Sequence, residues 1–333
     1  MRILVPIVNV AADNHLAKVL NILDRNIPSS FFYNNISSFT IVQGKDALKH
    51  LERILTTKIS KVGTNSKHES LICDSNGRIV DYLSIYIMDH KVLIVTNNHK
   101  GDEIRSRLSK GIPWNEDVEI LNGDNSIKRI IVSENDLNKI LESIDYSVEE
   151  IDDSTWIEDG DNIISINKRS KVKTLELLLP KTVLSDIIEE YQKKDIKEIN
   201  EEEWKKFRIY TGMIDFSDIV GRIPFDVGMD ELVKMDKGCY PGQEIHARLE
   251  SRGKQKKILV TLKSGKFLKE GEYKIIEGGR VIITTAYNGG KEESLFFGIV
   301  PIKYLKMSKL SLINGIEMRI ENVVNFRSLN VHH

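Results

Sequence analysis

The sequence predicts an α+β protein whose last segment is all β. Before about Lys254, stretches with apolar residues at the helical spacing of three and four alternate with short β-type runs. After Lys254 the helical period disappears, and short strands with turn signals between them continue toward the end. This order predicts two α+β blocks followed by a small β-barrel or sandwich.

The first block, residues 1–122, is predicted to form one antiparallel sheet with helices on one face. Helices are expected at 47–55 and 103–108, where apolar residues recur at helical spacing. Ser75-Asn76-Gly77 is a strong hairpin signal, so the strands on either side of it should pair as part of a meander. The strands are expected at 39–42, 71–74, 78–88 and 92–96.

The second block, residues 123–253, repeats this style, and the third, residues 254–330, is the all-β segment. In the second block, Asn200 and Glu203 form a capping box that predicts the start of a helix. Its other elements are expected as strands at 127–133 and 174–179, a strand pair at 156–166 broken at Gly160-Asp161, and helices at 135–144 and 183–191. The last block is expected to hold strands at 256–262, 273–276, 280–287, 295–300 and 316–324.

The composition is that of an ordinary folded protein and excludes several classes. Among 333 residues, 48 Lys and Arg balance 49 Asp and Glu, and the net charge of −1 argues against a dedicated nucleic-acid-binding protein. No stretch has the roughly 18 consecutive apolar residues of a membrane span. Cys73 and Cys239 are the only cysteines, which excludes a disulfide framework and a cluster site built from this chain alone. We therefore expect a cytoplasmic protein with no membrane partner, no direct nucleic-acid partner and no metal site of its own.

One stretch stands apart, Lys237-Gly238-Cys239-Tyr240-Pro241-Gly242-Gln243-Glu244. Its two glycines and its proline impose an unusual backbone path, and a helix is expected to open just after Cys239. A thiol at a helix N-terminus beside Lys237 would have a lowered pKa and react as thiolate. The alternative is a buried cysteine that packs as a small apolar residue at a junction. The residues alone leave both open.

This stretch resembles the K-G-C-[FY]-x-G-Q-E signature of the YgfZ/IBA57 family, relatives of the glycine-cleavage T-protein (aminomethyltransferase) that bind tetrahydrofolate. The similarity extends over about residues 35–325. It includes the family's R-x-x-x-R-G continuation at Arg248 and Arg252, its R-[IL]-x-x-G at 208–212 and its P-x-E at 224–226. It also includes the superfamily's v-x-G-x-D-A helix opening at 42–47 and its D-x-x-G-R-[IV] hairpin at 74–79.

The resemblance implies a three-domain cloverleaf, with two α+β domains around a central folate-sized channel and a C-terminal β-barrel. The T-protein transfers an aminomethyl group to tetrahydrofolate. The YgfZ/IBA57 branch is associated instead with assembly or repair of [4Fe-4S] enzymes, including radical enzymes that modify tRNA. The Cys239 motif favours the second branch, because T-proteins have no cysteine there.

The resemblance also implies the site residues, with three departures from the T-protein pattern. Asp81 precedes Tyr82 where the T-protein has an Asp-Asp pair beside the reacting folate nitrogen. Tyr210 stands where a glutamate clamps the pterin's donor edge, and Asp226 is one methylene shorter than the family's glutamate. Asp81 is thus the acid expected near the reacting atoms, or else a solvated strand carboxylate.

Cys239 is expected to be the functional thiol, tuned by Lys237, while Gly238, Pro241 and Gly242 shape its turn. The cofactor-binding set is Tyr210, Asp226, Tyr240, Gln243, Glu244 and Arg248. Gln243 and Glu244 orient the loop or the channel, or simply cap a helix. Arg248 pairs with the folate glutamate tail or with a carboxylate of the chain.

The leading hypothesis is a tetrahydrofolate-binding protein that assists iron-sulfur enzymes or cluster carriers through Cys239. The alternative is a folate-dependent aminomethyltransferase, so an enzymatic one-carbon transfer stays open. A pure binding module, in which Cys239 is structural, is a third possibility.

Overall fold

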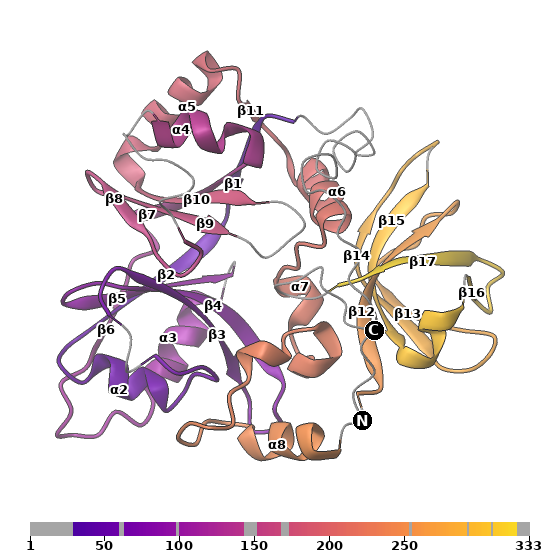
Figure 1. Cartoon of the computed structure of the whole chain (residues 1–333), viewed down its shortest axis with the longest axis horizontal. Coiled ribbons are helices and arrows are strands. Elements are labelled where there is room, and N and C mark those ends of the chain that lie inside the picture. The colour runs from indigo at the N-terminus through magenta and orange to yellow at the C-terminus, as the bar shows by residue number, and fades with distance from the viewer. Residues whose placement is uncertain are drawn as a thin grey trace, which may run out of the picture.

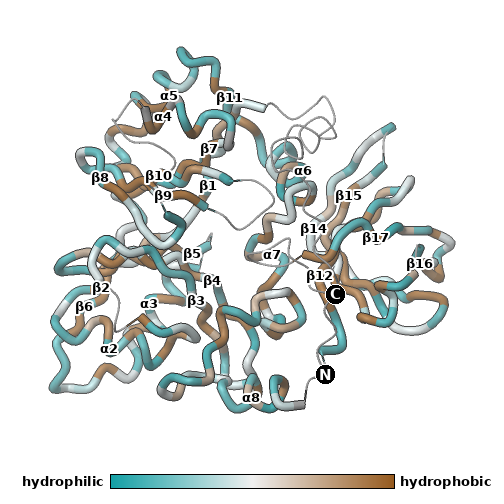
Figure 2. Tube along the Cα trace, in the orientation of Figure 1, coloured by the Kyte–Doolittle hydropathy of each residue, from teal (hydrophilic) through white to brown (hydrophobic). Residues whose placement is uncertain are grey.

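The computed structural model describes residues 29–59, 63–97, 100–142, 152–167, 173–252, 255–291, 293–307 and 309–324. Its strands form three sheets, and these lie around the short helices near the centre of Figure 1. Strands are the most hydrophobic parts of the trace, whereas helix α8 (Gln243–Arg252) and the outer loops are largely hydrophilic (Figure 2).

The first sheet has five strands in the order β3-β4-β5-β2-β6. Helices α2 (Ala47–Glu52) and α3 (Gly101–Ser109) pack on one face through buried Leu51, Ile104 and Leu108. The predicted meander is confirmed, because β3 pairs antiparallel with β4 and β4 with β5. The strands are β2 (Ser37–Gln43), β3 (Ser66–Cys73), β4 (Ile79–Ile87), β5 (Lys91–Asn97) and β6 (Glu119–Asn122).

The second sheet has six strands in the order β11-β1-β7-β10-β9-β8. Helices α4 (Leu137–Glu142) and α5 (Leu184–Lys193) pack on it through Leu137, Ile140 and Tyr191. Short 3₁₀ turns, Glu134–Asp136 and Lys181–Val183, precede the two helices. The strands are β1 (Phe31–Asn35), β7 (Ile127–Val132), β8 (Ile157–Asp159), β9 (Asn162–Asn167), β10 (Thr174–Pro180) and β11 (Lys197–Glu198).

Strand β1 differs from the sequence-based expectation, since it comes from the first block yet lies in the second sheet. Phe32 pairs with Val132 of β7, and only Ile36 separates β1 from β2 of the first sheet. The run Phe-Phe-Tyr-Asn-Asn lacks the apolar alternation of a half-buried strand, because Phe31 and Phe32 are both buried, in different clusters. The block boundaries at residues 122 and 253 stay a prediction.

The third sheet is formed by the last part of the chain, in the order β13-β14-β15-β12-β17-β16. An antiparallel bridge between Ile275 and Leu312 joins the regions beyond its two outer strands. A 3₁₀ turn, Ile302–Lys306, follows β15 and buries Tyr304. The strands are β12 (Lys257–Ser264), β13 (Gly271–Lys274), β14 (Arg280–Tyr287), β15 (Ser294–Pro301), β16 (Leu310–Ser311) and β17 (Glu317–Val323).

A connecting segment joins the second sheet to the third. It contains α6 (Glu201–Thr211), α7 (Phe216–Ile219), the 3₁₀ turns Pro224–Val227 and Asp230–Leu232, and α8. The predicted capping box is confirmed, since the Asn200 side chain accepts from the Glu203 backbone and Glu203 returns the contact. Helix α6 lies between the two sheets, against Phe31 on one side and β14 on the other (Figure 1).

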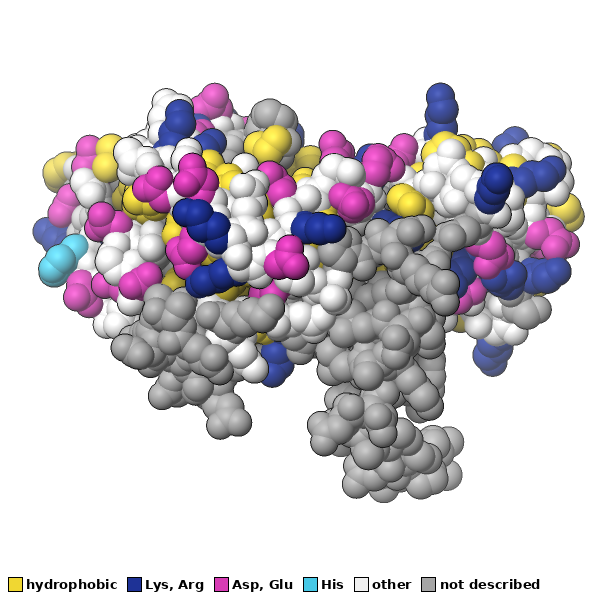
Figure 3. All heavy atoms as spheres, turned by 90° about the horizontal axis from the view of Figure 1, so that it is seen from above, with side chains coloured by type: hydrophobic (Ala, Val, Ile, Leu, Met, Phe, Trp, Pro, Cys, Tyr) yellow, Lys and Arg dark blue, Asp and Glu magenta, His cyan; other side chains and the backbone are white. Residues whose placement is uncertain are grey.

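Basic and acidic side chains alternate over the face seen from above, without a large patch of one sign (Figure 3). No helix in the part of the chain that the structure describes is long and apolar enough to cross a membrane.

Candidate functional site

A small cavity of about 40 Å³, partly open to solvent, lies where the first two sheets and the connecting segment meet. The first sheet contributes Tyr82, Ser84, Val95, Thr96 and Asn97, and the second contributes Asn35, Arg129, Ile131 and Asn167. The connecting segment contributes Trp204, Arg208, Met213, Ile214, Asp215, Ile219 and Met229. The wall thus combines apolar and aromatic surface with a few polar groups, the usual composition of a small-molecule site.

Arg129 and Arg208, the two arginines of the cavity wall, each form an ion pair with a buried carboxylate that is not part of the wall. Arg129 Nε lies 2.7 Å from Glu176 Oε1, and Glu176 also pairs with buried Lys67 at 3.1 Å. Arg208 Nη1 donates to Asp218 Oδ2 at 2.8 Å, and Asp218 Oδ1 accepts from Thr284 and Thr285 of β14. These networks fix the arginines and link the three sheets, but they leave little free positive charge for a ligand.

Asp215, which the sequence did not single out, is the only carboxylate among the described residues that line the cavity. Its Oδ1 accepts from the backbone N–H of Phe216 at 2.7 Å and thereby caps α7. Its Oδ2 lies 3.9 Å from Arg208 Nε, beyond hydrogen-bond distance, and its side chain is 33% exposed.

Asp81 is fully buried next to Tyr82 of the cavity wall and does not itself line the cavity. Its Oδ1 accepts from the Tyr82 backbone at 2.8 Å and from Asn97 Nδ2 at 3.5 Å, and its Oδ2 has no hydrogen-bond partner among the described residues. Burial raises the pKa of Asp81 to about 7, and the charge of Asp215 adds to the rise. Of the two expectations for Asp81, the solvated strand carboxylate is therefore wrong.

Tyr210 and Asp226, the other two positions that depart from the T-protein pattern, do not line this cavity. Tyr210 lies on α6 against the core that joins the connecting segment to the third sheet, with Lys263 Nζ 5.8 Å from its ring centre. Asp226 lines a separate outer groove beside α8, together with Phe225, Gln255 and Lys257. Burial raises the pKa of Asp226, while Lys257, Arg78 and Arg222 act against this rise.

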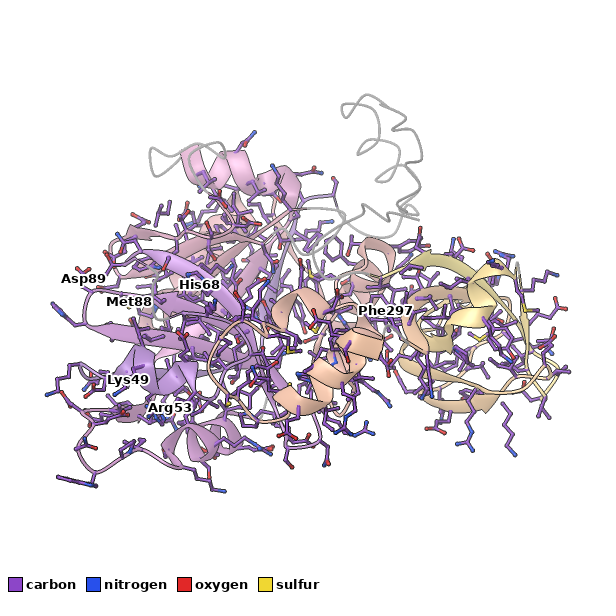
Figure 4. All side chains as sticks on the ribbon, turned by 60° about the horizontal axis from the view of Figure 1, so that its bottom comes forward. Lys49, Arg53, His68, Met88, Asp89 and Phe297 are labelled. Atoms are coloured by element: carbon purple, nitrogen blue, oxygen red, sulfur yellow. The ribbon has the colours of Figure 1, made fainter. Side chains whose placement is uncertain are left out.

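The Cys239 motif forms a loop that is fastened to the first sheet, and we call residues 237–246 the clasp. Lys237 Nζ donates to the backbone carbonyls of Glu52, Leu55 and Thr57, which lie at and after the end of α2. Lys49 and Arg53 project from α2 (Figure 4) and pair with Glu116, which anchors that helix from another side. Because the Lys237 ammonium is half-buried, desolvation lowers its pKa to about 8.

The clasp is also locked onto the hairpin between β3 and β4. His246 is fully buried, donates from Nε2 to the Gly77 carbonyl at 2.8 Å and accepts at Nδ1 from the Tyr240 hydroxyl at 3.2 Å. Burial lowers the pKa of His246, which favours the neutral ring that this pattern requires. Gly242 has a φ of +85°, and a Cβ there would lie 2.5 Å from Gly77 Cα.

Cys239 is exposed, whereas Tyr240 next to it is buried. The helix predicted after Cys239 is confirmed as α8, but it begins at Gln243, so the thiol lies four residues before the first turn and not at the helix N-terminus. Gly242 has a left-handed backbone conformation, which a right-handed α-helix does not contain, so the helix can begin only after this residue. A lowered pKa of the Cys239 thiol stays a prediction. The alternative of a buried junction cysteine is wrong for Cys239.

The predicted cofactor-binding residues of the clasp do not face the central cavity. Tyr240 packs inside the clasp, and Gln243 donates to the Lys237 carbonyl at 3.5 Å, which orients the loop. Exposed positions on the clasp and on α8 are Gly238, Pro241, Glu244 and Arg248. The described residues contain no group of three or more His, Cys, Asp or Glu arranged to hold a metal ion.

The chain has the fold of a solved aminomethyltransferase. It aligns with the glycine cleavage system aminomethyltransferase T from Bartonella henselae with a TM-score of 0.78, over 93% of this chain and 91% of that one, at 14% identity. No protein-family model matches the chain.

Curated proteins with similar sequences carry two kinds of name. An aminomethyltransferase from Thermoanaerobacter pseudethanolicus is 23% identical over 90% of this chain and 83% of its own length. Another from Caldanaerobacter subterraneus is 22% identical over 85% of this chain and 78% of its own length. The tRNA-modifying protein YgfZ of Photorhabdus laumondii is 22% identical over 66% of each chain. Fold and sequence together support a place for this chain in the T-protein-like superfamily.

Proposed function

We propose that this protein binds tetrahydrofolate or a one-carbon derivative in the central cavity and assists iron-sulfur enzymes through the Cys239 thiol. The observation that carries the proposal is the clasp. Its Lys237, Tyr240 and His246 are held by hydrogen bonds, while the Cys239 thiol is presented to solvent. An exposed thiol on a fixed loop is available to a second molecule.

The side chains that line the cavity suit the ring system of a folate. The cavity volume of about 40 Å³ is below the roughly 300–1,000 Å³ of small-molecule sites, so the wall has to open when a ring enters. Trp204, Ile131 and Met229 provide apolar surface for a flat ring, and Asp215 and Asn97 provide hydrogen-bond acceptors for ring N–H groups.

The exposed thiol suits a transient role at an iron-sulfur cluster. Cluster irons are bound by cysteine thiolates, and one exposed cysteine supplies a single ligand. The remaining ligands would come from a client enzyme or a cluster carrier, which are the partners that we propose. The YgfZ relative is named as a tRNA-modifying protein, and this name fits clients that modify tRNA.

A second candidate, aminomethyl transfer to tetrahydrofolate, is favoured by a different observation. The aminomethyltransferase relatives match over 85–90% of this chain, and Asp81 holds a carboxyl of raised pKa close to the cavity. A group with a pKa near 7 is suited to proton transfer at neutral pH. In this function the protein is an enzyme and Cys239 is dispensable.

Titration with tetrahydrofolate tests the premise that both functions share. We expect saturable binding by calorimetry at ligand concentrations below millimolar, with quenching of Trp204 fluorescence. Absence of saturable binding at millimolar ligand would remove both functions.

Cys239→Ser separates the two functions. If the proposal is right, cells that carry this variant lose activity of iron-sulfur enzymes, while tetrahydrofolate binding in vitro is unchanged. Cys73→Ser is the control thiol, because Cys73 is buried in the hairpin strand. Release of ammonia and a one-carbon folate from an aminomethyl donor, at equal rates in wild type and Cys239→Ser, would favour the transferase.

A further inference from the structure

We infer that the outer groove beside α8 is the docking site for the protein partner that uses Cys239, and that it takes a partner segment with an apolar side chain flanked by charged ones. The groove has a volume of about 570 Å³ and lies between the connecting segment and the start of β12. This inference rests on the proposed function and deepens it, because it assigns the surface on which the client enzyme or cluster carrier binds.

The apolar side chains of the groove are the first argument. Ile223, Phe225, Val233 and Leu249 line it, and they come from three parts of the connecting segment. The groove volume lies within the roughly 300–1,000 Å³ of binding sites that enclose a ligand group. A partner side chain that fills it removes apolar surface of both molecules from water, which is the main driving force of protein association.

The charged side chains of the groove are the second argument. Asp226, Asp230 and Glu250 belong to the connecting segment, whereas Lys256 and Lys257 lie at the start of β12. None of the five forms an ion pair with another described residue, although Lys257 lies near enough to Asp226 to act on its pKa. A basic residue of the partner on the carboxylate side and an acidic one on the lysine side would complement both.

The same carboxylates argue for a protein rather than a nucleic acid as the occupant. Nucleic acids are bound mainly through Lys and Arg contacts with their phosphates. Three carboxylates in the wall of the groove would repel those phosphates.

The position of the groove next to the clasp is the third argument. Phe225 of the groove packs against the His246 ring of the clasp in a T-shaped contact, with ring centres 6.0 Å apart. Helix α8 begins inside the clasp and leads toward the start of β12 (Figure 1).

A single partner can therefore cover both the groove and the thiol. Leu249 lies six residues after the start of α8 at Gln243, and Cys239 lies four residues before it. At about 1.5 Å per helical residue and at most about 3.6 Å per extended residue, Leu249 is within about 25 Å of Cys239. A standard interface covers about 800 Å² on each partner, which is a patch roughly 30 Å across.

The test reverses the charge on the carboxylate side with the double substitution Asp230→Lys and Glu250→Lys. Both side chains are exposed, and neither lines the central cavity. In cells that lack the natural protein, we expect the activity of iron-sulfur enzymes to fall at least about fivefold relative to wild type, as it does with Cys239→Ser. The purified variant should keep the wild-type melting temperature and the wild-type affinity for tetrahydrofolate, measured by calorimetry.

Two further variants make the comparison decisive. Asp230→Asn with Glu250→Gln removes the charges without reversing them, and it should lose less activity in the same direction even where the lysine pair folds poorly. Glu158→Lys with Glu277→Lys is the matched control, since it changes the net charge by the same amount at exposed positions of the second and third sheets. This control is expected to behave as wild type does.

Wild-type enzyme activity in both groove variants, in cells where Cys239→Ser loses it, would overturn this inference and leave the proposed function standing. Wild-type activity in Cys239→Ser as well would overturn both. Weaker tetrahydrofolate binding in the groove variants would make a folate the occupant. A wild-type dimer in light scattering that the lysine pair dissociates would make a second copy of this chain the occupant, and either result would overturn the assignment to a client or carrier.

Discussion

The clasp and the central cavity are built in opposite ways. The clasp is a contiguous run, 237–246, whose key residues bind backbone groups of α2 and of the β3–β4 hairpin. The cavity wall is not made by any one stretch of sequence, since it draws one to three residues each from β1, β4, β5, β7, β9 and α6 and further residues from the segment around α7. The most distinctive stretch of the sequence thus lies outside the cavity between the first two sheets.

The difference teaches what a sequence motif reports. Lys237, Gly242 and His246 are constrained by tight contacts with fixed backbone, and such contacts tolerate one residue type. Within this constrained frame Cys239 makes no comparable contact, so its place in the motif has no packing explanation. Lys237, Gly242 and His246 therefore have a structural role, and the exposed thiol of Cys239 is the candidate reactive group.

Gly242→Ala should give the largest effect and break the clasp. A Cβ would lie 2.5 Å from Gly77 Cα and 2.6 Å from the Asp74 carbonyl, and φ is +85°. We expect a loss of about 3 kcal/mol in the free energy of unfolding, measured by urea denaturation. Gly238→Ala is the control, because its Cβ would meet nothing within 4 Å, and it should change stability by less than about 0.5 kcal/mol. Equal losses in both variants would contradict the close approach to Gly77.

Asp81→Asn tests whether the carboxyl beside the cavity stays protonated in the folded protein, through the pH dependence of the free energy of unfolding. Burial raises the pKa of Asp81 from 3.8 to about 7, so the folded chain keeps a proton that the unfolded chain has already lost between these values. Wild-type stability should therefore fall as pH rises from about 4 to 7, and the variant lacks this loss. Relative to wild type, the variant should gain about 2–3 kcal/mol between pH 5 and pH 8. Parallel stability curves for the two proteins would show that Asp81 ionises normally.

Lys237→Met should loosen the clasp by a smaller amount. The variant loses three hydrogen bonds to carbonyls around the end of α2, and we expect a cost of about 2 kcal/mol. Lys58→Met is the matched control, since Lys58 makes an exposed ion pair with Asp236 that should contribute at most about 0.5 kcal/mol. Hydrogen exchange at the α2 amides should quicken only in the first variant. Unchanged exchange there would argue against the clasp.

Cys239→Ser should have almost no effect on stability, which sharpens the contrast with its neighbours. Cys239 is exposed, whereas Cys73 is 1% exposed and burial raises the pKa of its thiol to about 12. Iodoacetamide should therefore label one thiol in the native protein and two in denaturant, as counted by mass spectrometry. Rapid labelling of Cys73 in the native protein would contradict the placement of the hairpin strand.

Local patterns predicted most of the elements, because hairpin turns and helix caps act over a few residues. Ser75-Asn76-Gly77 and the Asn200–Glu203 box lie where the sequence predicted them. Strand β1 escaped prediction, since both Phe31 and Phe32 are buried and the usual alternation is lost. Asp215 escaped prediction as a lining residue of the cavity because the rest of the wall comes from strands of the first two sheets, which only the fold brings together.

The structure of the tetrahydrofolate complex tests the central claim most directly. The account predicts the ring in the central cavity, against Trp204 and Ile131, and Cys239 on the outside, unchanged. Tetrahydrofolate in the outer groove beside Asp226, or in contact with the clasp, would contradict it.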